Sequence, residues 1–174
     1  MTEHIFLTGR KQVGKSTLIR KVLNLYTESV GGFFTVRTDT VFPGRFSVHM
    51  LQAGTNSAPS KDNLLFLCGE KDGRTAERFD ALGCAALGAG RSARLLIMDE
   101  LGPAEAEALR FQKAVLQALD GEVPILGVLQ EADSLFLQKA AAHPGVTILR
   151  VTEDNRDQVS LIEKVLEIIS QNRS

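Results

Sequence analysis

The sequence predicts an α/β fold: a three-layer sandwich in which helices cover both faces of a mainly parallel sheet. The first observation behind this prediction is that short apolar runs alternate along the chain with segments of helical apolar spacing. The second is that Pro43-Gly44 separates two consecutive β-like runs, which adds an antiparallel hairpin. The chain has 174 residues, of which 44% are hydrophobic and 24% charged, so we expect one globular domain over 1–174.

The amino-terminal half is predicted to begin with a buried strand at residues 5–8, an apolar run that ends at Gly9. A helix at 16–25 follows, since its spacing places Leu18, Val22 and Leu25 on one face. Three β-like runs come next, and the first two form the hairpin; the runs cover residues 32–36, 46–51 and 64–68. The stretch between the last two runs is rich in Gly, Asn, Ser and Pro, which predicts a loop within the domain.

The carboxyl-terminal half alternates more regularly. Strands are predicted at residues 94–98, 124–129 and 146–151, and helices at 75–87, 104–119, 134–142 and 158–169. The second of these helices is expected to begin after Pro103. The inner face of the last helix is expected to hold Val159, Ile162, Val165, Leu166 and Ile169. Folds of this kind bind ligands beyond the carboxyl ends of their strands, so we expect the chemistry there.

Charge and composition exclude several classes of protein. The net charge is −1, which argues against a nucleic-acid-binding protein that relies on a broad basic surface. Residues 1–50 nevertheless carry a net charge of +4, a distribution that suits a small anionic ligand. No apolar run has the roughly 18 residues of a membrane helix, and residues 1–4 lack the basic start of a signal peptide. With only two cysteines, Cys68 and Cys84, we expect a cytoplasmic protein without a membrane partner.

The strongest motif follows the first strand directly and matches the phosphate-loop pattern GxxxxGK[ST]. Glycines allow the loop to turn its N–H groups toward an anion, and the next helix adds the positive end of its dipole. Lys15 is predicted to contact the β- and γ-phosphates, and the Ser16 hydroxyl to bind Mg²⁺. The predicted nucleotide-binding residues are Gly9, Arg10, Lys11, Gln12, Val13, Gly14, Lys15, Ser16 and Thr17.

A second motif lies at the end of the strand predicted at 94–98, where four apolar residues precede Asp99 and Glu100. An aspartate at this place is suited to hold Mg²⁺ beside a phosphate loop, which makes Ser16 and Asp99 the predicted metal residues. A neighbouring glutamate is suited to accept a proton from an attacking water. Glu100 and Lys15 are therefore the predicted catalytic residues.

Together, the two motifs and three further segments resemble the small P-loop nucleoside-triphosphatases known from thermophiles and animals, a family that includes the cancer-related nucleoside triphosphatases. The further segments are residues 32–37, 98–103 and 151–157, in the same order as in the family. The resemblance implies a P-loop fold and Mg²⁺-dependent hydrolysis of nucleoside triphosphates with weak discrimination between bases. The chain departs from the family at Lys11-Gln12, where Pro-Gly is common, and at Gln130, where His is frequent.

Several residues have two interpretations. Asn155 and Arg156 follow the last strand, where they are suited to bond to or stack on a base, and we include both among the nucleotide-binding residues. The alternative for Asn155 is a helix N-cap. Arg37 and Gln130 are suited to reach the γ-phosphate, and the alternatives are a solvated strand residue and a loop amide.

The functional prediction is a monomeric enzyme that hydrolyses ATP, GTP and other nucleoside 5'-triphosphates to the diphosphate and phosphate. Two alternatives use the same parts. A kinase would pass the γ-phosphoryl group to a nucleotide or another small acceptor. A nucleotide-dependent switch would hydrolyse slowly and wait for a partner.

Overall fold

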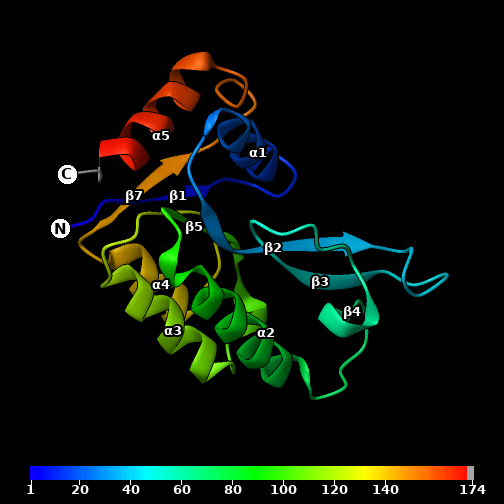
Figure 1. Ribbon diagram of the computed structural model, residues 1–174. Helices are drawn as coiled ribbons and strands as arrows, with labels where there is room; N and C mark the ends of the chain where they lie inside the picture. Colours follow the sequence, from blue (N-terminus) through cyan, green and yellow to red (C-terminus); the bar gives the residue numbers. More distant parts are fainter. Residues whose placement is uncertain (172–174) are drawn as a thin grey trace.

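The computed structural model describes residues 1–171 and contains one seven-stranded sheet (Figure 1). The strands lie in the order β4-β3-β2-β5-β6-β1-β7. Their bounds are β1 His4–Thr8, β2 Val30–Thr38, β3 Ser47–Gln52, β4 Leu64–Leu67, β5 Leu95–Leu101, β6 Ile125–Leu129 and β7 Val146–Arg150. The predicted domain over 1–174 includes three residues, 172–174, that lie outside the described part of the chain.

Five strands form the parallel part of the sheet, from β2 through β5, β6 and β1 to β7. The predicted hairpin is confirmed, because β2 and β3 pair antiparallel, and β4 extends it by pairing antiparallel with β3. Parallel strands end at the same edge of a sheet, so the segments that follow β1, β5, β6 and β7 meet there. β6 separates β1, which precedes the phosphate loop, from β5, which carries the acidic pair.

Helices cover both faces of the sheet and produce the predicted three layers (Figure 1). The helices α1 and α5 pack on one face, and α2, α3 and α4 pack on the other. Their bounds are α1 Lys15–Leu25, α2 Thr75–Ala89, α3 Leu109–Leu119, α4 Leu135–Ala142 and α5 Val159–Gln171. In the described residues, no helix is both long and apolar enough to cross a membrane.

The core under α2 and α3 contains a group of aromatic rings. Phe111 makes edge contacts with Phe33, at 5.5 Å between ring centroids, and packs against Phe79 at 5.8 Å. Gly83 permits this packing, because a Cβ atom there would lie 2.2 Å from the Phe111 ring. Substituting Gly83 would therefore separate α2 from α3 at the centre of this core.

One predicted helix boundary is wrong. The helix expected over 104–119 begins only at Leu109, and residues Pro103–Glu105 form a single 3-10 turn instead. The Glu105 carboxylate accepts the N–H of Gly102 at 2.9 Å and closes that turn, while the Asp80 carboxylate accepts the N–H of Phe111 at the start of α3. A side chain near in sequence, Glu105, and one distant in sequence, Asp80, together decide where the helix starts. The strand expected at 94–98 is also longer, so Asp99 and Glu100 lie within β5 rather than after it.

Two residues expected on buried helix faces are exposed. Leu25 is 61% exposed and Val159 is 66% exposed. Each lies in the terminal turn of its helix, whereas the buried positions of α1 end at Val22 and those of α5 begin at Val165. Apolar spacing identifies a helix face but not how far the sheet beneath it extends.

Candidate functional site

The loop between β1 and α1 has a conformation that requires glycine at both of its fixed positions. Gly9 has φ of 144° and Gly14 has φ of 113°, values that other residues rarely adopt. At Gly9, a Cβ atom would also lie 2.5 Å from the carbonyl oxygen of Val151. The loop borders a cavity of about 950 Å³ at the carboxyl edge of the sheet, and Asp99, Glu100 and Gln130 border the same cavity.

Lys15 is the first residue of α1, and its side chain folds back over the loop. Only 8% of the residue is exposed, and Nζ donates to the carbonyl oxygens of Gly9 at 2.5 Å and Arg10 at 3.0 Å. The ammonium group is therefore held inside the loop by backbone carbonyls, where its charge faces the same cavity. Arg10, Lys11, Gln12, Ser16 and Thr17 are exposed along the loop and the start of α1.

Ser16 and Asp99, the two predicted metal residues, lie side by side at the cavity. The Ser16 hydroxyl donates to Oδ1 of Asp99 at 3.0 Å. Asp99 is only 4% exposed, and this burial raises the pKa of its carboxyl to about 6. The hydrogen bond from Ser16 lowers that pKa, whereas the charge of Glu100 raises it further. These two oxygens form the kind of donor pair that suits Mg²⁺, a hard cation. Across residues 1–171, no cluster of three or more His, Cys, Asp or Glu side chains could hold a metal.

Glu100 has different neighbours from Asp99, although the two are adjacent in β5. Nε2 of Gln130, directly after β6, donates a hydrogen bond to Oε1 of Glu100. The backbone of Gln130 is itself fixed, because its N–H donates to the carbonyl oxygen of Leu101 at 2.9 Å. Gln130 thus holds one oxygen of a half-buried carboxylate that borders the cavity.

Glu105 is a cavity residue that the sequence analysis missed. It is 2% exposed, and burial raises the pKa of its carboxyl to about 8, with a smaller upward contribution from the charge of Glu100. A signal was present, because Glu105 stands three residues after Gly102, the spacing of the acid in a capping box. The predicted helix hid that signal by placing Glu105 in an ordinary first turn.

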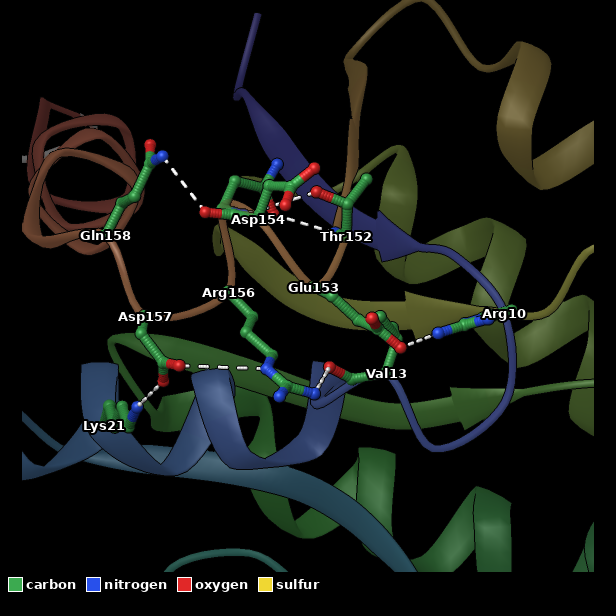
Figure 2. Close-up of polar contacts among 10 residues, drawn as sticks. Arg10, Val13, Lys21, Thr152, Glu153, Asp154, Arg156, Asp157 and Gln158 are labelled. Carbon is green, nitrogen blue, oxygen red and sulfur yellow. Dashed lines mark hydrogen bonds and ion pairs between the residues drawn. The ribbon is translucent and has the colours of Figure 1, made fainter.

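The loop between β7 and α5 is tied to the phosphate loop and to α1, as Figure 2 shows. Glu153 forms an ion pair with Arg10, and Asp157 accepts from Lys21 at 2.8 Å. Nη1 of Arg156 donates to the carbonyl oxygen of Val13 at 3.3 Å. These contacts bring the segment after the last strand against the loop that follows the first one.

Asn155 and Arg156 are placed differently within that segment. Oδ1 of Asn155 accepts the N–H of Thr152 at 2.8 Å, and its Nδ2 donates to the carbonyl oxygen of Arg150 at 2.9 Å. Both ends of the Asn155 amide therefore stabilise the turn of the loop. The stem of Arg156, in contrast, lies over Gly14, where an added Cβ atom would be 3.3 Å from its Cδ. The structure thus brings Arg156 to the phosphate loop through its side chain.

Comparisons with known proteins find relatives along nearly the whole chain. A nucleoside-triphosphatase named THEP1 from Thermotoga petrophila is 29% identical to the chain, over 97% of this chain and 94% of that protein. The solution structure of a human cancer-related nucleoside triphosphatase has a TM-score of 0.69 and 26% identity, covering 99% of this chain and 100% of the other. The crystal structure of THEP1 from the hyperthermophile Aquifex aeolicus has a TM-score of 0.73 at 20% identity, covering 97% and 99%.

The match to a family model is equally broad. The model, described as NTPase, matches residues 4–166, which extend from the first residue of β1 into α5 and include every loop that borders the site. The fold is that of the P-loop nucleoside triphosphatases, as the two solved structures show. The chain therefore belongs to the NTPase family.

Proposed function

We propose that this protein hydrolyses nucleoside 5'-triphosphates, ATP and GTP among them, to the diphosphate and phosphate with Mg²⁺ and with weak base specificity. The observation that carries the proposal is the convergence of Lys15, the Ser16–Asp99 pair and Glu100 on one cavity. Proteins that are similar to this chain over nearly its whole length are named nucleoside-triphosphatases, which supports the same reaction.

The phosphate chain is proposed to bind in the loop over residues 9–17. Backbone N–H groups of such a loop and the start of α1 attract the phosphate oxygens. Lys15 would exchange its two bonds to loop carbonyls for bonds to the β- and γ-phosphates, where its charge offsets theirs. Because its ammonium group is already held at the loop, little ordering of the side chain accompanies binding.

Ser16 and Asp99 are the residues proposed to hold Mg²⁺. The hydroxyl and the carboxylate supply two oxygen ligands, and a nucleotide supplies further oxygens, as is usual for this ion. Bound Mg²⁺ would offset the negative charge that the β- and γ-phosphates share. A direct ionic contact would also favour the ionised form of Asp99, whose pKa burial raises to about 6.

Glu100 is proposed as the group that orients and deprotonates water. The water oxygen forms a bond to the γ-phosphorus, the bond from that phosphorus to the β–γ bridging oxygen breaks, and the carboxylate accepts the water proton. Because Gln130 donates to one oxygen of Glu100, the other remains to receive that proton. Gln130 acts here as a positioning residue, since its contact is with Glu100.

The base is proposed to lie against Arg156. A guanidinium plane stacks on any aromatic base with little regard to its hydrogen-bonding groups, which accounts for weak base specificity. Asn155 would contribute by holding the turn that presents Arg156. We further propose that residues 1–174 form one domain that acts as a monomer in the cytoplasm, and the two free cysteines, Cys68 and Cys84, support a reducing compartment.

The test is phosphate release from ATP, GTP, CTP and UTP, with Mg²⁺ and with a chelator. Wild-type protein is expected to release phosphate from all four at similar rates, only with Mg²⁺. Lys15→Ala should lower the rate by about 10²–10³-fold for every nucleotide. The matched control is Lys139→Ala on α4, an exposed lysine far from the cavity, which should leave the rate unchanged.

Two results would contradict the proposal. One is phosphate release that Lys15→Ala leaves intact, because the reaction would then not use this loop. The other is tight Mg²⁺–nucleotide binding without release, which would point to an acceptor other than water or to an activating partner.

A further inference from the structure

The cavity continues beyond the phosphate loop into a region that is lined mostly by apolar side chains. We call this region the ring compartment and define it by Arg37, Val48, Phe66 and Phe79, all of which border the cavity. Neither the phosphate loop nor the acidic pair contributes a side chain to these walls. About 950 Å³ is near the upper end of the usual range for ligand cavities, so a nucleotide in the loop would leave room for another molecule.

Three of the four residues form one row across the antiparallel strands. Arg37 of β2 pairs with Val48 of β3, and Val48 pairs with Phe66 of β4. Directly paired residues of antiparallel strands project from the same face of a sheet, so these side chains lie side by side. Phe79 of α2 covers the inner end of this row, in the same hydrophobic cluster as Val48 and Phe66.

The ring compartment is remote from the place proposed for the base. Phe34 of β2 pairs with Asp99, and Arg37 follows three residues later, about 10 Å farther along the strand. The loop that carries Arg156 follows β7, which is the opposite end of the sheet from β3 and β4. A nucleotide lying from the phosphate loop toward Arg156 therefore leaves the ring compartment open.

The surroundings of Arg37 indicate the charge of a ligand. The guanidinium lies over the ring of Phe46, with 4.3 Å from Cζ to the ring centroid. No carboxylate forms an ion pair with Arg37 among residues 1–171. The cavity carboxylates are Asp99 and Glu100 in β5, Glu105 after β5 and Glu131 after β6, away from the outer end where Arg37 lies.

We propose that the ring compartment binds a second ligand, a small planar aromatic anion, with its ring against Val48 and Phe66 and its anionic group at Arg37. Apolar walls with one convergent charged group are the usual form of a small-molecule site. Half-buried Val48 and Phe66 would lose their remaining exposure to water when the ring binds.

A bound ligand would also affect hydrolysis, and this part of the inference rests on the proposed function. The compartment is continuous with the cavity that Glu100 borders. An occupant would therefore restrict the water that reaches Glu100 without contacting the phosphate loop. It should lower kcat for phosphate release and leave KM for the nucleotide unchanged.

The test uses 8-anilinonaphthalene-1-sulfonate, a fluorescent aromatic anion of the proposed class, titrated into the full-length protein. We expect saturable binding at one site per chain, and a decrease in affinity of about ten-fold for Arg37→Gln. The matched control is Arg45→Gln in the same hairpin, since Arg45 pairs with Glu70 and does not border the cavity. Phe66→Leu keeps an apolar side chain and removes the ring, so it should weaken binding while preserving the fold. Lys15→Ala should bind the probe as wild type does.

Binding that Arg37→Gln and Phe66→Leu leave unchanged would overturn the proposal, as would loss of binding in Lys15→Ala or the absence of saturable binding in wild type. The kinetic measurement separates this inference from the proposed function. If wild type releases no phosphate, the proposed function fails, and the fluorescence titration still decides whether the second ligand site exists.

Discussion

Asp99 and Glu100 are neighbours in β5, yet their surroundings differ. Asp99 is almost fully buried and bonded to Ser16 of α1, so its position follows from the packing of the phosphate loop and its helix. Glu100 is half-buried at the cavity wall, and the side chain of one residue, Gln130, holds it. The comparison indicates that the metal side of the site is built into the core of the fold. On the water side, Glu100 is held among the described residues by one side-chain hydrogen bond, from Gln130, which a substitution can remove.

The largest effect is expected on the metal side. Asp99→Asn keeps the shape of the side chain and removes its charge, which leaves Ser16 with a neutral partner. We expect phosphate release to fall by about 10³-fold at low Mg²⁺ and to recover in part as Mg²⁺ is raised. The measurement is the Mg²⁺ dependence of the rate. Asp133→Asn, at an exposed aspartate, is the control, and an unchanged Mg²⁺ dependence in Asp99→Asn would show that Asp99 holds no metal.

A smaller effect is expected at the contact that positions Glu100. Gln130→Ala removes one charge-assisted hydrogen bond, a change that corresponds to about a ten-fold decrease in kcat. The Kd for nucleotide should not change, because Gln130 acts through Glu100. Gln130→His restores an N–H donor and should recover part of the rate. A loss of nucleotide binding in Gln130→Ala would instead assign Gln130 to the phosphates.

Stability should depend on pH through Glu105, a carboxyl that the proposed reaction does not use. Its pKa is raised from 4.5 to about 8 by burial, so the folded state binds its proton more tightly than the unfolded state. The resulting stabilisation is fully present below pH 4.5 and is lost as the pH rises through about 8. The free energy of unfolding of Glu105→Gln, measured with urea between pH 5 and pH 9, should therefore decline less with rising pH than that of wild type. Equal slopes for the two proteins would mean that Glu105 ionises freely in the folded state.

The smallest effect is expected at His4, the first residue of β1, whereas the cavity lies at the carboxyl edge of the sheet. Its Nδ1 accepts the N–H of Ile125 and its Nε2 donates to the carbonyl oxygen of Leu119, so the ring is held neutral. Burial lowers the pKa of His4 below 6.5. The stabilisation is present above pH 6.5 and is lost as the pH falls through the lowered pKa. Tm measured from pH 8 to pH 5 should decline less in His4→Gln than in wild type, and parallel curves would contradict this assignment.

The same contrast explains how much could be predicted from the sequence. The phosphate loop is local in the chain, and its spacing specifies its geometry, so Gly9, Gly14 and Lys15 could be placed before the structure was known. The acidic pair could be predicted because a buried strand leads directly into it. The mainly parallel sheet and its antiparallel hairpin could be predicted from the alternation of elements and one turn signal, whereas the strand order could not.

The remaining features depend on residues distant in the sequence. Gln130 reaches Glu100 only because β6 lies beside β5, and the sequence does not show that these two strands are neighbours. The start of α3 depends on Asp80 of α2, which no local pattern near Leu109 reveals. The row that contains Arg37 depends on the register of three strands, and a shift of one residue would place its side chains on the other face.

The separate roles proposed for Asp99 and Glu100 are tested most directly by one substitution, Glu100→Gln, with two measurements on the same preparation. We predict that its Kd for Mg²⁺–ATP stays within about two-fold of wild type, because a neutral amide of the same shape leaves Ser16, Asp99 and Lys15 in place. Phosphate release in a single turnover should fall by about 10²–10³-fold, within the contribution expected of a general base. Release at the wild-type rate, or loss of nucleotide binding, would contradict the assignment of water activation to Glu100 and of nucleotide binding to its neighbours.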